Sequence, residues 1–364
     1  MAKRNILVLG AGKIGSLITC MLAQSGDFKV TIASIKLKEA EKLVKELGLK
    51  HVTVSQVDAQ DPAALEKVMI SDKYDAVVSG LPYYCNTLVA DFAAKHNINY
   101  FDLTEDVEVT HHVRTLAQGR KTVFMPQCGL APGFISIAAG ELISHFDSLD
   151  IVKMRVGALP VNPNNVLKYS LTWSTDGLIN EYGNLCYGIE DGKPIALLPL
   201  EGLETITLDG VLYEAFNTSG GLGTLADTFA GKVRTMNYKT LRYPGHCANI
   251  RLLMNDLRLN HDRDTLKRIL ESAVPKTLQD VVLIYVAVTG QKNGMLFEEN
   301  YAKKIYPQTI GGRLWSSIQV TTAAGICSVV DVVLSHLDRY SGFVTQESIK
   351  LSDVTANRFG KYYA

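Results

Sequence analysis

Three glycines near the start of the 364-residue chain have the type and spacing needed to bind a phosphate group. Gly10, Gly12 and Gly15 fit the pattern G-x-G-x-x-G. In this pattern the first glycine makes a tight turn, the second lets a pyrophosphate approach the backbone, and the third lets a helix pack close to a strand. The phosphates then rest on the N–H groups at the positive end of that helix, so Lys13 and Ile14 are expected to bind the cofactor as well.

The elements on either side of the glycines are those that a dinucleotide-binding unit needs. An apolar run at residues 6–9 predicts a strand buried on both faces. Apolar residues at helical spacing over 14–22 predict a helix, and residues 29–33 predict a second strand. A glycine triplet alone is a weak signal, but the order strand, glycine loop, helix, strand makes it specific. The alternative is a tight turn in an α/β protein that binds no nucleotide.

The end of the second predicted strand bears on the choice of dinucleotide. Sites for NAD usually place Asp or Glu there, where it bonds the ribose 2′-OH. This chain has Ser34 and Lys36 instead, which could hold a 2′-phosphate, so the sequence favours NADP over NAD. The alternative is that Lys36 belongs to a solvated helix start and that NAD binds in another way. Asp58, at the end of the third predicted strand, is either an adenine-ribose contact or a loop residue.

Strands and helices alternate up to residue 125, which predicts an α/β fold with a doubly wound parallel sheet. Further strands are expected at residues 52–57, 74–80, 100–103 and 122–125, with helices between them. In such sheets, ligands bind beyond the carboxyl ends of the strands. One crevice is therefore expected to receive the loops that contain Gly10, Ser34, Asp58, Leu81, Pro82 and Asp102, of which Leu81 and Pro82 are further cofactor contacts.

After residue 128 the pattern changes to one typical of an α+β domain. A helix is predicted at residues 135–143, and helices at 175–182 and 251–257 interrupt the strands. A last helix, at 321–337, is expected to return to the first domain. The predicted division is therefore 1–128, 129–320 and 321–364. The predicted strands of the second domain are residues 151–158, 168–173, 204–208 and 281–289.

The amino-acid composition indicates which kinds of partner and which cellular compartment to expect. Lys plus Arg equals Asp plus Glu at 37 each, without a basic block, so no nucleic-acid partner is expected. No apolar stretch approaches the roughly 20 residues that span a bilayer, so no membrane partner is expected. The six cysteines lack metal-ligand spacing, which predicts neither a metal site nor a disulfide framework. A reducing cytoplasm is the expected compartment.

Four further stretches resemble the saccharopine dehydrogenase family, which includes glutamate-forming saccharopine reductases and lysine 6-dehydrogenases. They read C-G-L-A-P-G-F at 128–134, Y-S-L-T-W-S at 169–174, F-N-T-S-G-G at 216–221 and L-R-Y-P-G-H at 241–246. The resemblance covers nearly the whole chain, although these motifs do not separate the family's members. Two departures are Ser170, where relatives often carry Lys, and Cys128, which replaces other small or apolar residues.

The resemblance implies NAD(P)-linked oxidation or reduction of a C–N bond in a lysine-derived amino acid substrate. It also implies a second domain that binds this substrate and carries dimer contacts, so a homodimer is expected. The leading expectation is a saccharopine dehydrogenase that forms L-glutamate, and its nearest rival is a lysine 6-dehydrogenase. The alternative from another class is a non-catalytic NADP-binding redox regulator, because a fold alone does not fix a function.

Oxidation of a C–N bond requires a base, because hydride leaves the carbon only when the nitrogen lone pair is free. His246 is the first candidate base, since histidine titrates near neutral pH without assistance. The alternative is a histidine that caps the turn after Pro244 and Gly245. Asp102 is expected either to orient the substrate's ammonium group or to serve as a helix cap.

The carboxylates of an amino-acid substrate favour Arg242 as a bidentate anchor, with a structural ion pair as the alternative. Arg155 and Arg251 are candidates for anchoring a second carboxylate. Tyr83 either lines the nicotinamide pocket or packs in the core. Trp173 and Ser174 are expected to shape the substrate pocket, and backbone N–H groups of the F-N-T-S-G-G stretch could cradle a carboxylate. The residues of that stretch assigned to the substrate are Thr218, Ser219 and Gly220.

Overall fold

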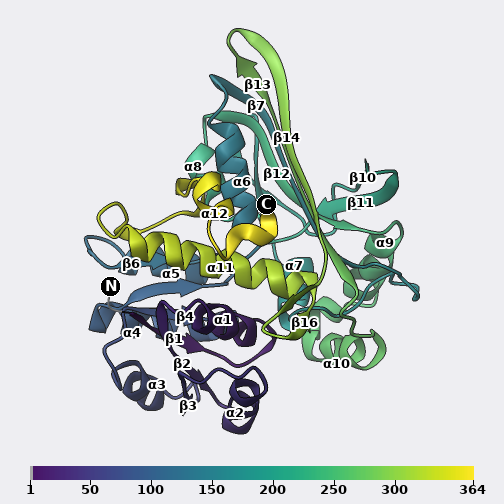
Figure 1. Ribbon diagram of the computed structural model, residues 1–364. Coiled ribbons are helices and arrows are strands. Elements are labelled where there is room, and N and C mark those ends of the chain that lie inside the picture. The colour runs from purple at the N-terminus through teal and green to yellow at the C-terminus, as the bar shows by residue number, and fades with distance from the viewer. Residues whose placement is uncertain (1–2) are drawn as a thin grey trace. The chain divides into compact units, whose positions relative to one another are not determined.

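The computed structural model describes residues 3–364, which fold as two compact units. The first unit contains the chain up to Phe134 together with Thr309–Leu314 and Gln319–Ala364. The second unit contains Ile135–Gln308 and Trp315–Ile318. Figure 1 follows the chain by colour from purple to yellow and labels the elements of both units. The finer division at residues 128 and 320 stays a prediction.

A seven-stranded parallel sheet forms the centre of the first unit, in the order β17-β6-β5-β4-β1-β2-β3. This order confirms the predicted α/β class and its doubly wound parallel sheet. The interior strand β1, between β4 and β2, is buried from its second residue onward, as the apolar run predicted. The strands are β1 (Arg4–Leu9), β2 (Phe28–Ser34), β3 (Val52–Gln56), β4 (Ala76–Ser79), β5 (Asn99–Asp102), β6 (Val123–Met125) and β17 (Gly342–Phe343).

The helices of the first unit begin where the sequence supplies a suitable start. The Asp61 side chain accepts hydrogen bonds from the N–H groups of Ala63 and Ala64, and Pro62 is the first residue of α3, as predicted. Asp106 caps α5 in the same way. The helices are α1 (Lys13–Gln24), α2 (Leu37–Glu46), α3 (Pro62–Met69), α4 (Tyr83–His96), α5 (Val107–Leu116), α11 (Ser317–Ser335) and α12 (Leu351–Thr355), with single turns at Gln346–Ser348 and Gly360–Tyr363.

The last part of the chain supplies an edge strand to the first sheet. In β17, Gly342 pairs with Val123 and Phe343 pairs with Phe124 of β6, in parallel. Phe343 packs against the apolar core between the sheet and its helices. The sheet therefore combines strands from the two ends of the sequence.

The second unit is built on a mixed eight-stranded sheet, whose central strands β7 and β12 run parallel. Figure 1 shows the long hairpin of β13 and β14 beside them. Its path is β10-β11-β12-β7-β13-β14, with β8 pairing with β12 and β9 pairing with β8. The strands are β7 (Ser148–Pro160), β8 (Cys186–Glu190), β9 (Lys193–Leu197), β10 (Glu204–Leu208), β11 (Val211–Asn217), β12 (Val233–Arg242), β13 (Asp280–Lys292) and β14 (Met295–Ile305).

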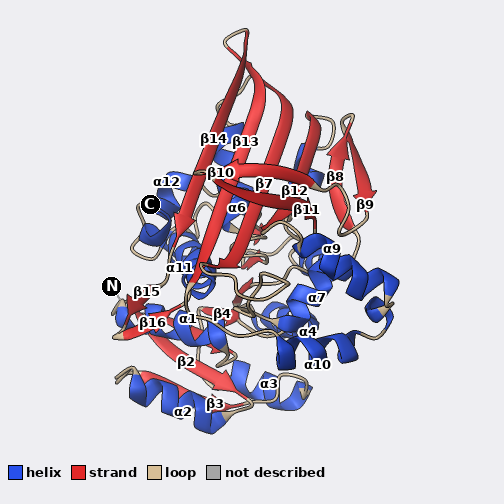
Figure 2. Cartoon of the chain, turned by 90° about the vertical axis from the view of Figure 1, so that its right-hand side faces the viewer, coloured by secondary structure: helices blue, strands red, loops and turns tan. Residues whose placement is uncertain are grey.

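A group of helices adjoins this sheet, and Figure 2 shows α7, α9 and α10 gathered together. Their apolar side chains share one buried cluster with Tyr169 and Phe216. The helices are α6 (Phe134–Ile143), α7 (Thr175–Gly183), α8 (Leu225–Phe229), α9 (His246–Arg251) and α10 (Arg263–Ala273), with a π-helical turn at Leu252–Asp256 and a 3-10 turn at Leu259–His261. Two short strands, β15 (Gln308–Ile310) and β16 (Arg313–Trp315), pair with each other.

The predicted strand at residues 168–173 is wrong, because this stretch is irregular. The Asn165 side chain takes the backbone bonds that a strand neighbour would make: its amide donates to the Tyr169 carbonyl at 2.7 Å and accepts from the Tyr169 N–H at 3.3 Å. Lys168 also adopts a positive φ of 49°. The predicted helix at 251–257 is instead the end of α9 followed by the π-helical turn.

Five strands of the second sheet, namely β8, β9, β11, β12 and β14, were not predicted from the sequence. Three tight turns carry a signal for four of them, β8, β9, β11 and β14. Asp191-Gly192 joins β8 to β9, Asp209-Gly210 joins β10 to β11, and Asn293-Gly294 joins β13 to β14. Both residues of each pair have positive φ, as a two-residue hairpin turn requires.

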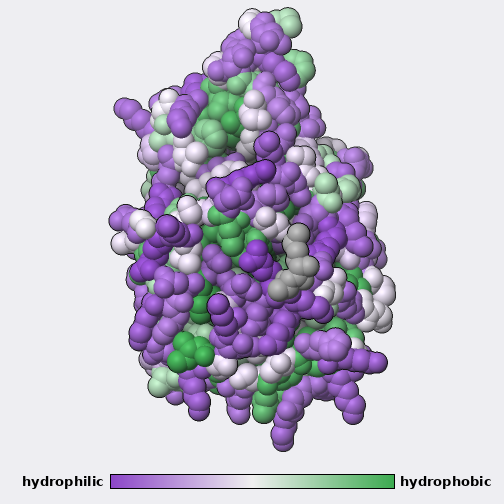
Figure 3. All heavy atoms as spheres, turned by 60° about the vertical axis from the view of Figure 1, so that its left-hand side comes forward, coloured by the Kyte–Doolittle hydropathy of each residue, from purple (hydrophilic) through white to green (hydrophobic). Residues whose placement is uncertain are grey.

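The expectation that no apolar stretch is long enough to span a membrane needs correction. Helix α11 has 19 residues and a mean hydropathy of 1.6, which passes the test of length and composition. However, 89% of the 18-residue apolar stretch of this helix is buried, and the core helix of a soluble protein passes the same test. The molecular face in Figure 3 is mostly hydrophilic, with small hydrophobic patches.

Candidate active site

The glycine loop between β1 and α1 has the geometry that a dinucleotide phosphate requires. Gly10 has φ +97°, and a Cβ on Gly15 would lie 2.0 Å from the carbonyl oxygen of Gly10. Only glycine therefore lets α1 start this close to β1. A Cβ on Gly12, by contrast, would meet nothing within 4 Å, and no side chain caps the helix. The open side at Gly12 and the uncapped helix start fit a pyrophosphate.

Lys13 and Ile14 are the first two residues of α1, directly after the glycine loop. The other cofactor residues predicted from sequence lie at or just after the carboxyl ends of the strands β2, β3 and β4. Ser34 ends β2, and its buried hydroxyl accepts a hydrogen bond from the Lys36 N–H at 3.3 Å. The exposed Lys36 ammonium pairs with Glu39 at 3.1 Å. Asp58 follows β3 and bonds the N–H of Gln60. After β4 come Leu81, Pro82, which is the N-cap of α4, and Tyr83, its first residue.

Asp102 ends β5 as a fully buried carboxylate with three hydrogen-bond donors. One oxygen accepts from the N–H groups of Thr104 and Gln127, both at 2.9 Å, and the other accepts from the Tyr100 hydroxyl at 2.5 Å. Burial raises the pKa of Asp102 to about 6, although these hydrogen bonds act in the opposite direction. A carboxyl with this pKa can exchange a proton near neutral pH.

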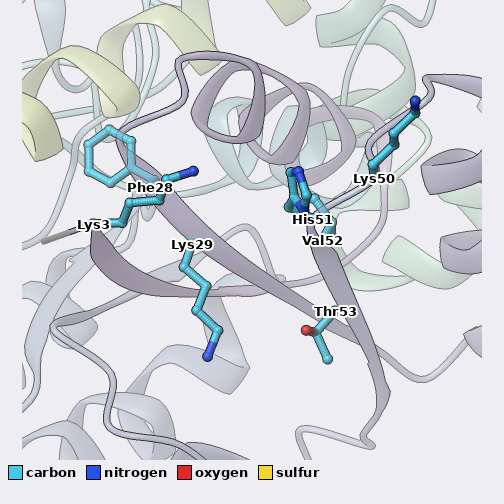
Figure 4. Close-up of a pocket in the computed structure, with 7 residues that line it drawn as sticks. All are labelled: Lys3, Phe28, Lys29, Lys50, His51, Val52 and Thr53. Atoms are coloured by element: carbon cyan, nitrogen blue, oxygen red, sulfur yellow. The ribbon is translucent and has the colours of Figure 1, made fainter.

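A separate pocket of about 440 Å³ opens near the amino ends of β2 and β3. It lies at the opposite end of these strands from the glycine loop. Figure 4 shows that Lys3, Lys29 and Lys50 extend in different directions and do not converge on one point. No group of three His, Cys, Asp or Glu side chains within residues 3–364 is arranged to hold a metal ion.

In the second unit, Arg242 is the centre of a buried polar cluster. Its guanidinium lies 5.1 Å from the ring centre of Tyr169 and 5.8 Å from that of Tyr182. Nε donates to the Tyr182 hydroxyl at 2.9 Å, and Nη1 donates to the Leu241 carbonyl at 2.9 Å. Within the described chain Nη2 has no hydrogen-bond partner, although the residue is only 3% exposed. A buried cation with an open donor suits an anionic ligand.

His246 joins this cluster but lacks the properties expected of a base. Its Nε2 lies 3.0 Å from the Tyr182 hydroxyl and its Nδ1 lies 2.7 Å from the Leu167 carbonyl, so both ring nitrogens are engaged. Burial, with the nearby Arg242 charge, lowers the pKa of His246 to about 3. The positive φ of Gly245 shows that a tight turn carries Arg242 and His246, as their spacing predicted.

Two buried carboxylates of this unit were not identified from sequence. Glu214 of β11 accepts from the N–H groups of Gly245 at 2.9 Å and Cys247 at 2.5 Å, which fixes the turn before α9. Glu181 of α7 is 9% exposed and acts electrostatically on Arg242 and Tyr182. The signal for Glu214 was an acidic residue in an otherwise apolar strand end, Y-E-A-F at 213–216.

The remaining predicted substrate residues serve mainly local structure. Trp173 donates from its indole nitrogen to the Tyr169 hydroxyl at 3.1 Å, and Ser174 caps α7. The Ser219 N–H donates to the Glu181 carbonyl, which removes one donor from the predicted backbone cradle.

Two residues of the F-N-T-S-G-G stretch keep features consistent with a binding role. Gly220 has φ +83°, a conformation that favours glycine. The buried Thr218 hydroxyl has no hydrogen-bond partner in the described chain, so it could bond a ligand.

Two profiles of one protein family match the two parts of the chain. The family profile "Saccharopine dehydrogenase NADP binding domain" matches residues 6–124, and "Saccharopine dehydrogenase C-terminal domain" matches residues 129–357. Saccharopine dehydrogenase [NADP(+), L-glutamate-forming] of Pyricularia oryzae is 27% identical over 53% of this chain and 43% of its own length. Carboxynorspermidine synthase of Vibrio cholerae is 22% identical over 42% of this chain and 44% of its own length.

Solved structures show the same fold. Saccharopine dehydrogenase (L-Glu forming) from Saccharomyces cerevisiae, in its apo form, has a TM-score of 0.76 at 18% identity, covering 97% of this chain and 95% of its own. A homospermidine synthase from Legionella pneumophila in complex with NAD has a TM-score of 0.67 at 14% identity, covering 99% of this chain and 90% of its own. The curated fungal relatives match over less than half of their own length.

Two glycines of the loop should respond to substitution in opposite ways. We expect Gly12→Val to fold normally but lose dinucleotide binding, because the new side chain enters open space where the phosphates would approach. Gly15→Ala should instead lower stability by roughly 1–3 kcal/mol, since its methyl group overlaps the Gly10 carbonyl. Urea unfolding and fluorescence titration with NADPH would measure both effects. Unchanged affinity in a folded Gly12→Val variant would contradict the assigned phosphate site.

The raised pKa of Asp102 should make stability depend on pH. The folded carboxyl, with a pKa of about 6, holds its proton more tightly than an unfolded one at 3.8. This stabilisation is therefore complete below pH 3.8 and is lost as pH rises through about 6, by at most about 3 kcal/mol. Asp102→Asn keeps an acceptor for both backbone N–H groups but cannot titrate. Urea unfolding of both proteins across this range measures the difference, and a pH-independent difference would rule out the shift.

Proposed function

Because the chain belongs to the saccharopine dehydrogenase family and has its NAD(P)-binding domain, we propose that it oxidises or reduces a C–N bond in a lysine-derived amino acid. Bound nicotinamide would accept or supply the hydride. The names of the curated relatives make saccharopine the first substrate to consider, with release of glutamate in the oxidative direction.

Arg242 is the observation that carries this proposal. Its guanidinium is buried, lies within 6 Å of two tyrosine ring centres (5.1 and 5.8 Å), and still has an open donor at Nη2. Such a group binds a carboxylate more strongly than an exposed arginine, because water competes poorly in a buried site. The α-carboxylate of an amino acid matches this anchor in charge and in geometry.

The reaction also requires a group that takes a proton from the substrate nitrogen. His246 does not suit this role, because both ring nitrogens are bonded and its pKa is lowered to about 3. Asp102 has a pKa of about 6, near the working range of a base, but its carboxylate is fully buried and both of its oxygens accept hydrogen bonds. We therefore assign the substrate carboxylate to Arg242 and no proton transfer to His246.

Free lysine is the second candidate substrate, and one observation favours it over saccharopine. Saccharopine carries three carboxylates, whereas lysine carries one. Of the three candidate arginines, Arg155 is bonded to Glu204 at 2.6 Å and Arg251 pairs with Glu201 at 3.2 Å. Arg242 alone among these three has no carboxylate partner within ion-pair distance in residues 3–364. One anchor fits an amino acid without the glutamyl arm.

The test adds L-lysine or saccharopine to the protein with NADP+ or NAD+ and follows the near-ultraviolet absorbance of the reduced nicotinamide. We expect one of the two substrates to reduce the cofactor. Arg242→Lys should raise the KM for that substrate by roughly 1–3 kcal/mol of binding, because lysine loses the planar fork. Arg251→Lys, at an exposed ion pair, is the matched control. Absence of reduction with both substrates and both cofactors would refute the proposal.

We further propose a preference for NADP over NAD. Ser34 stands where NAD sites carry an acidic residue, and Lys36 adds a cation two residues later. The family profile that matches this part of the chain is itself described as NADP-binding. Ser34→Asp should repel a 2′-phosphate and reverse the preference. Fluorescence titration of both proteins with NADPH and NADH is the measurement, and tighter NADH binding by the wild type would contradict the assignment.

A further inference from the structure

We infer that Tyr182 and His246 are positioning residues, which hold the Arg242 guanidinium as a rigid carboxylate anchor and exchange no proton with the substrate. This inference deepens the proposed function and rests on it for the nature of the ligand. It assigns a purpose to the L-R-Y-P-G-H stretch that differs from acid–base chemistry.

The donor and acceptor roles in the cluster follow from arginine chemistry. Arg242 Nε can only donate, so the Tyr182 oxygen must accept from it. The hydroxyl proton of Tyr182 then points to Nε2 of His246, 3.0 Å away. Nε2 is therefore the unprotonated nitrogen, and the proton on Nδ1 goes to the Leu167 carbonyl at 2.7 Å. The imidazole is neutral, in a single tautomer, and has no nitrogen left for a substrate.

The same contacts fix the direction of the guanidinium. Nε is held by Tyr182 and Nη1 by the Leu241 carbonyl, while the ring of Tyr169 lies against the guanidinium. Nη2 is the nitrogen that remains open. An arginine side chain is flexible when free, so fixing two of its three nitrogens before the ligand arrives reduces the entropy lost on binding.

The backbone around His246 is fixed as firmly as its ring. Glu214 pairs in register with Arg242 across β11 and β12, and its two oxygens bond the N–H groups of Gly245 and Cys247. A buried carboxylate thereby anchors the turn that separates Arg242 from His246. Phe216 stacks on the imidazole at 6.4 Å between ring centres.

The charged and titratable groups around His246 agree with a neutral ring. Arg242 opposes a second positive charge, and the buried hydroxyls of Tyr169 and Tyr182 carry none at neutral pH. Glu181 acts on Arg242 and the tyrosines, and Glu214 is engaged by backbone N–H groups.

Conservative and disruptive variants separate a positioning role from a proton-transfer role. Tyr182→Phe removes the acceptor of Nε and should raise KM about 10- to 100-fold with little change in kcat. His246→Gln keeps one donor and one acceptor at nearly the same places, so it should retain kcat and shift KM less, whereas His246→Leu should behave like Tyr182→Phe. The control is Tyr187→Phe, because Tyr187 is exposed on β8 outside the cluster.

If His246 were the base, His246→Gln would instead lower kcat by about 10²- to 10⁴-fold and remove a limb of the pH–rate profile. That result would overturn the inference. Equal KM values for wild type and Tyr182→Phe would overturn it as well. Affinity for NADPH should stay unchanged in all variants, which separates an effect on the anchor from general unfolding.

A second measurement does not depend on turnover and therefore separates failure of the inference from failure of the proposed function. Nitrogen-15 spectra of the imidazoles, with His246 assigned from its variants, report the tautomer directly. We expect a neutral ring protonated on Nδ1 from about pH 8 to about pH 5, and loss of this single tautomer in Tyr182→Phe. A His246 signal that titrates near pH 6.5 would overturn the inference, even if neither lysine nor saccharopine is a substrate.

Discussion

A guanidinium charge removed from water is the constraint around which the second unit is arranged. Arg242 is 3% exposed, and the free energy lost by removing its hydration must be offset by groups that surround it. Tyr169, Tyr182 and the Leu241 carbonyl provide contacts on several sides. These groups come from the irregular stretch before α7, from α7 itself and from β12, so satisfying one charge ties together three parts of the chain.

The first unit also contains a buried charged side chain, Asp102, which is the last residue of β5, as Arg242 is the last residue of β12. Asp102 receives donors from Tyr100, Thr104 and Gln127, which belong to β5 and to the segments that follow β5 and β6. The carboxylate thereby links two neighbouring strand ends of the parallel sheet. In both units a buried charged side chain orders the backbone around it, and Arg242 also keeps Nη2 without a hydrogen-bond partner in residues 3–364.

The sequence was sufficient to predict strands β1 to β6 of the first unit, because parallel sheets have nearly continuous apolar strands and glycines with defined tasks, but it did not predict the edge strand β17. Gly10 and Gly15 have the strained or crowded positions that the pattern implied. It was less informative for the second unit. Lys168 to Trp173 alternates like a strand, but the Asn165 side chain supplies local hydrogen bonds that no periodicity reveals. The Asp-Gly and Asn-Gly turns of this unit do carry a hairpin signal.

The chemistry of His246 illustrates a limit of residue type as a guide. Histidine has a suitable pKa in water, but Tyr182, Leu167 and burial fix it in its neutral form. Those neighbours lie tens of residues away in sequence, so their effect could not be predicted from the motif. Glu181 and Glu214 were missed for the same reason: what matters is their burial, which depends on how β11, β12 and α7 pack.

The edge strand β17 also has a consequence for the order in which the protein can be made. Strands β1 to β6 leave the ribosome first, yet the sheet that they form receives its last strand from residues 342–343, after the whole second unit has been synthesised. Tyr363 stacks on Phe134 with ring centres 3.6 Å apart and bonds the Thr321 carbonyl, so this late segment is also packed in the core. The strand that pairs with β6 in the folded protein is therefore available only after the residues of the second unit have been synthesised.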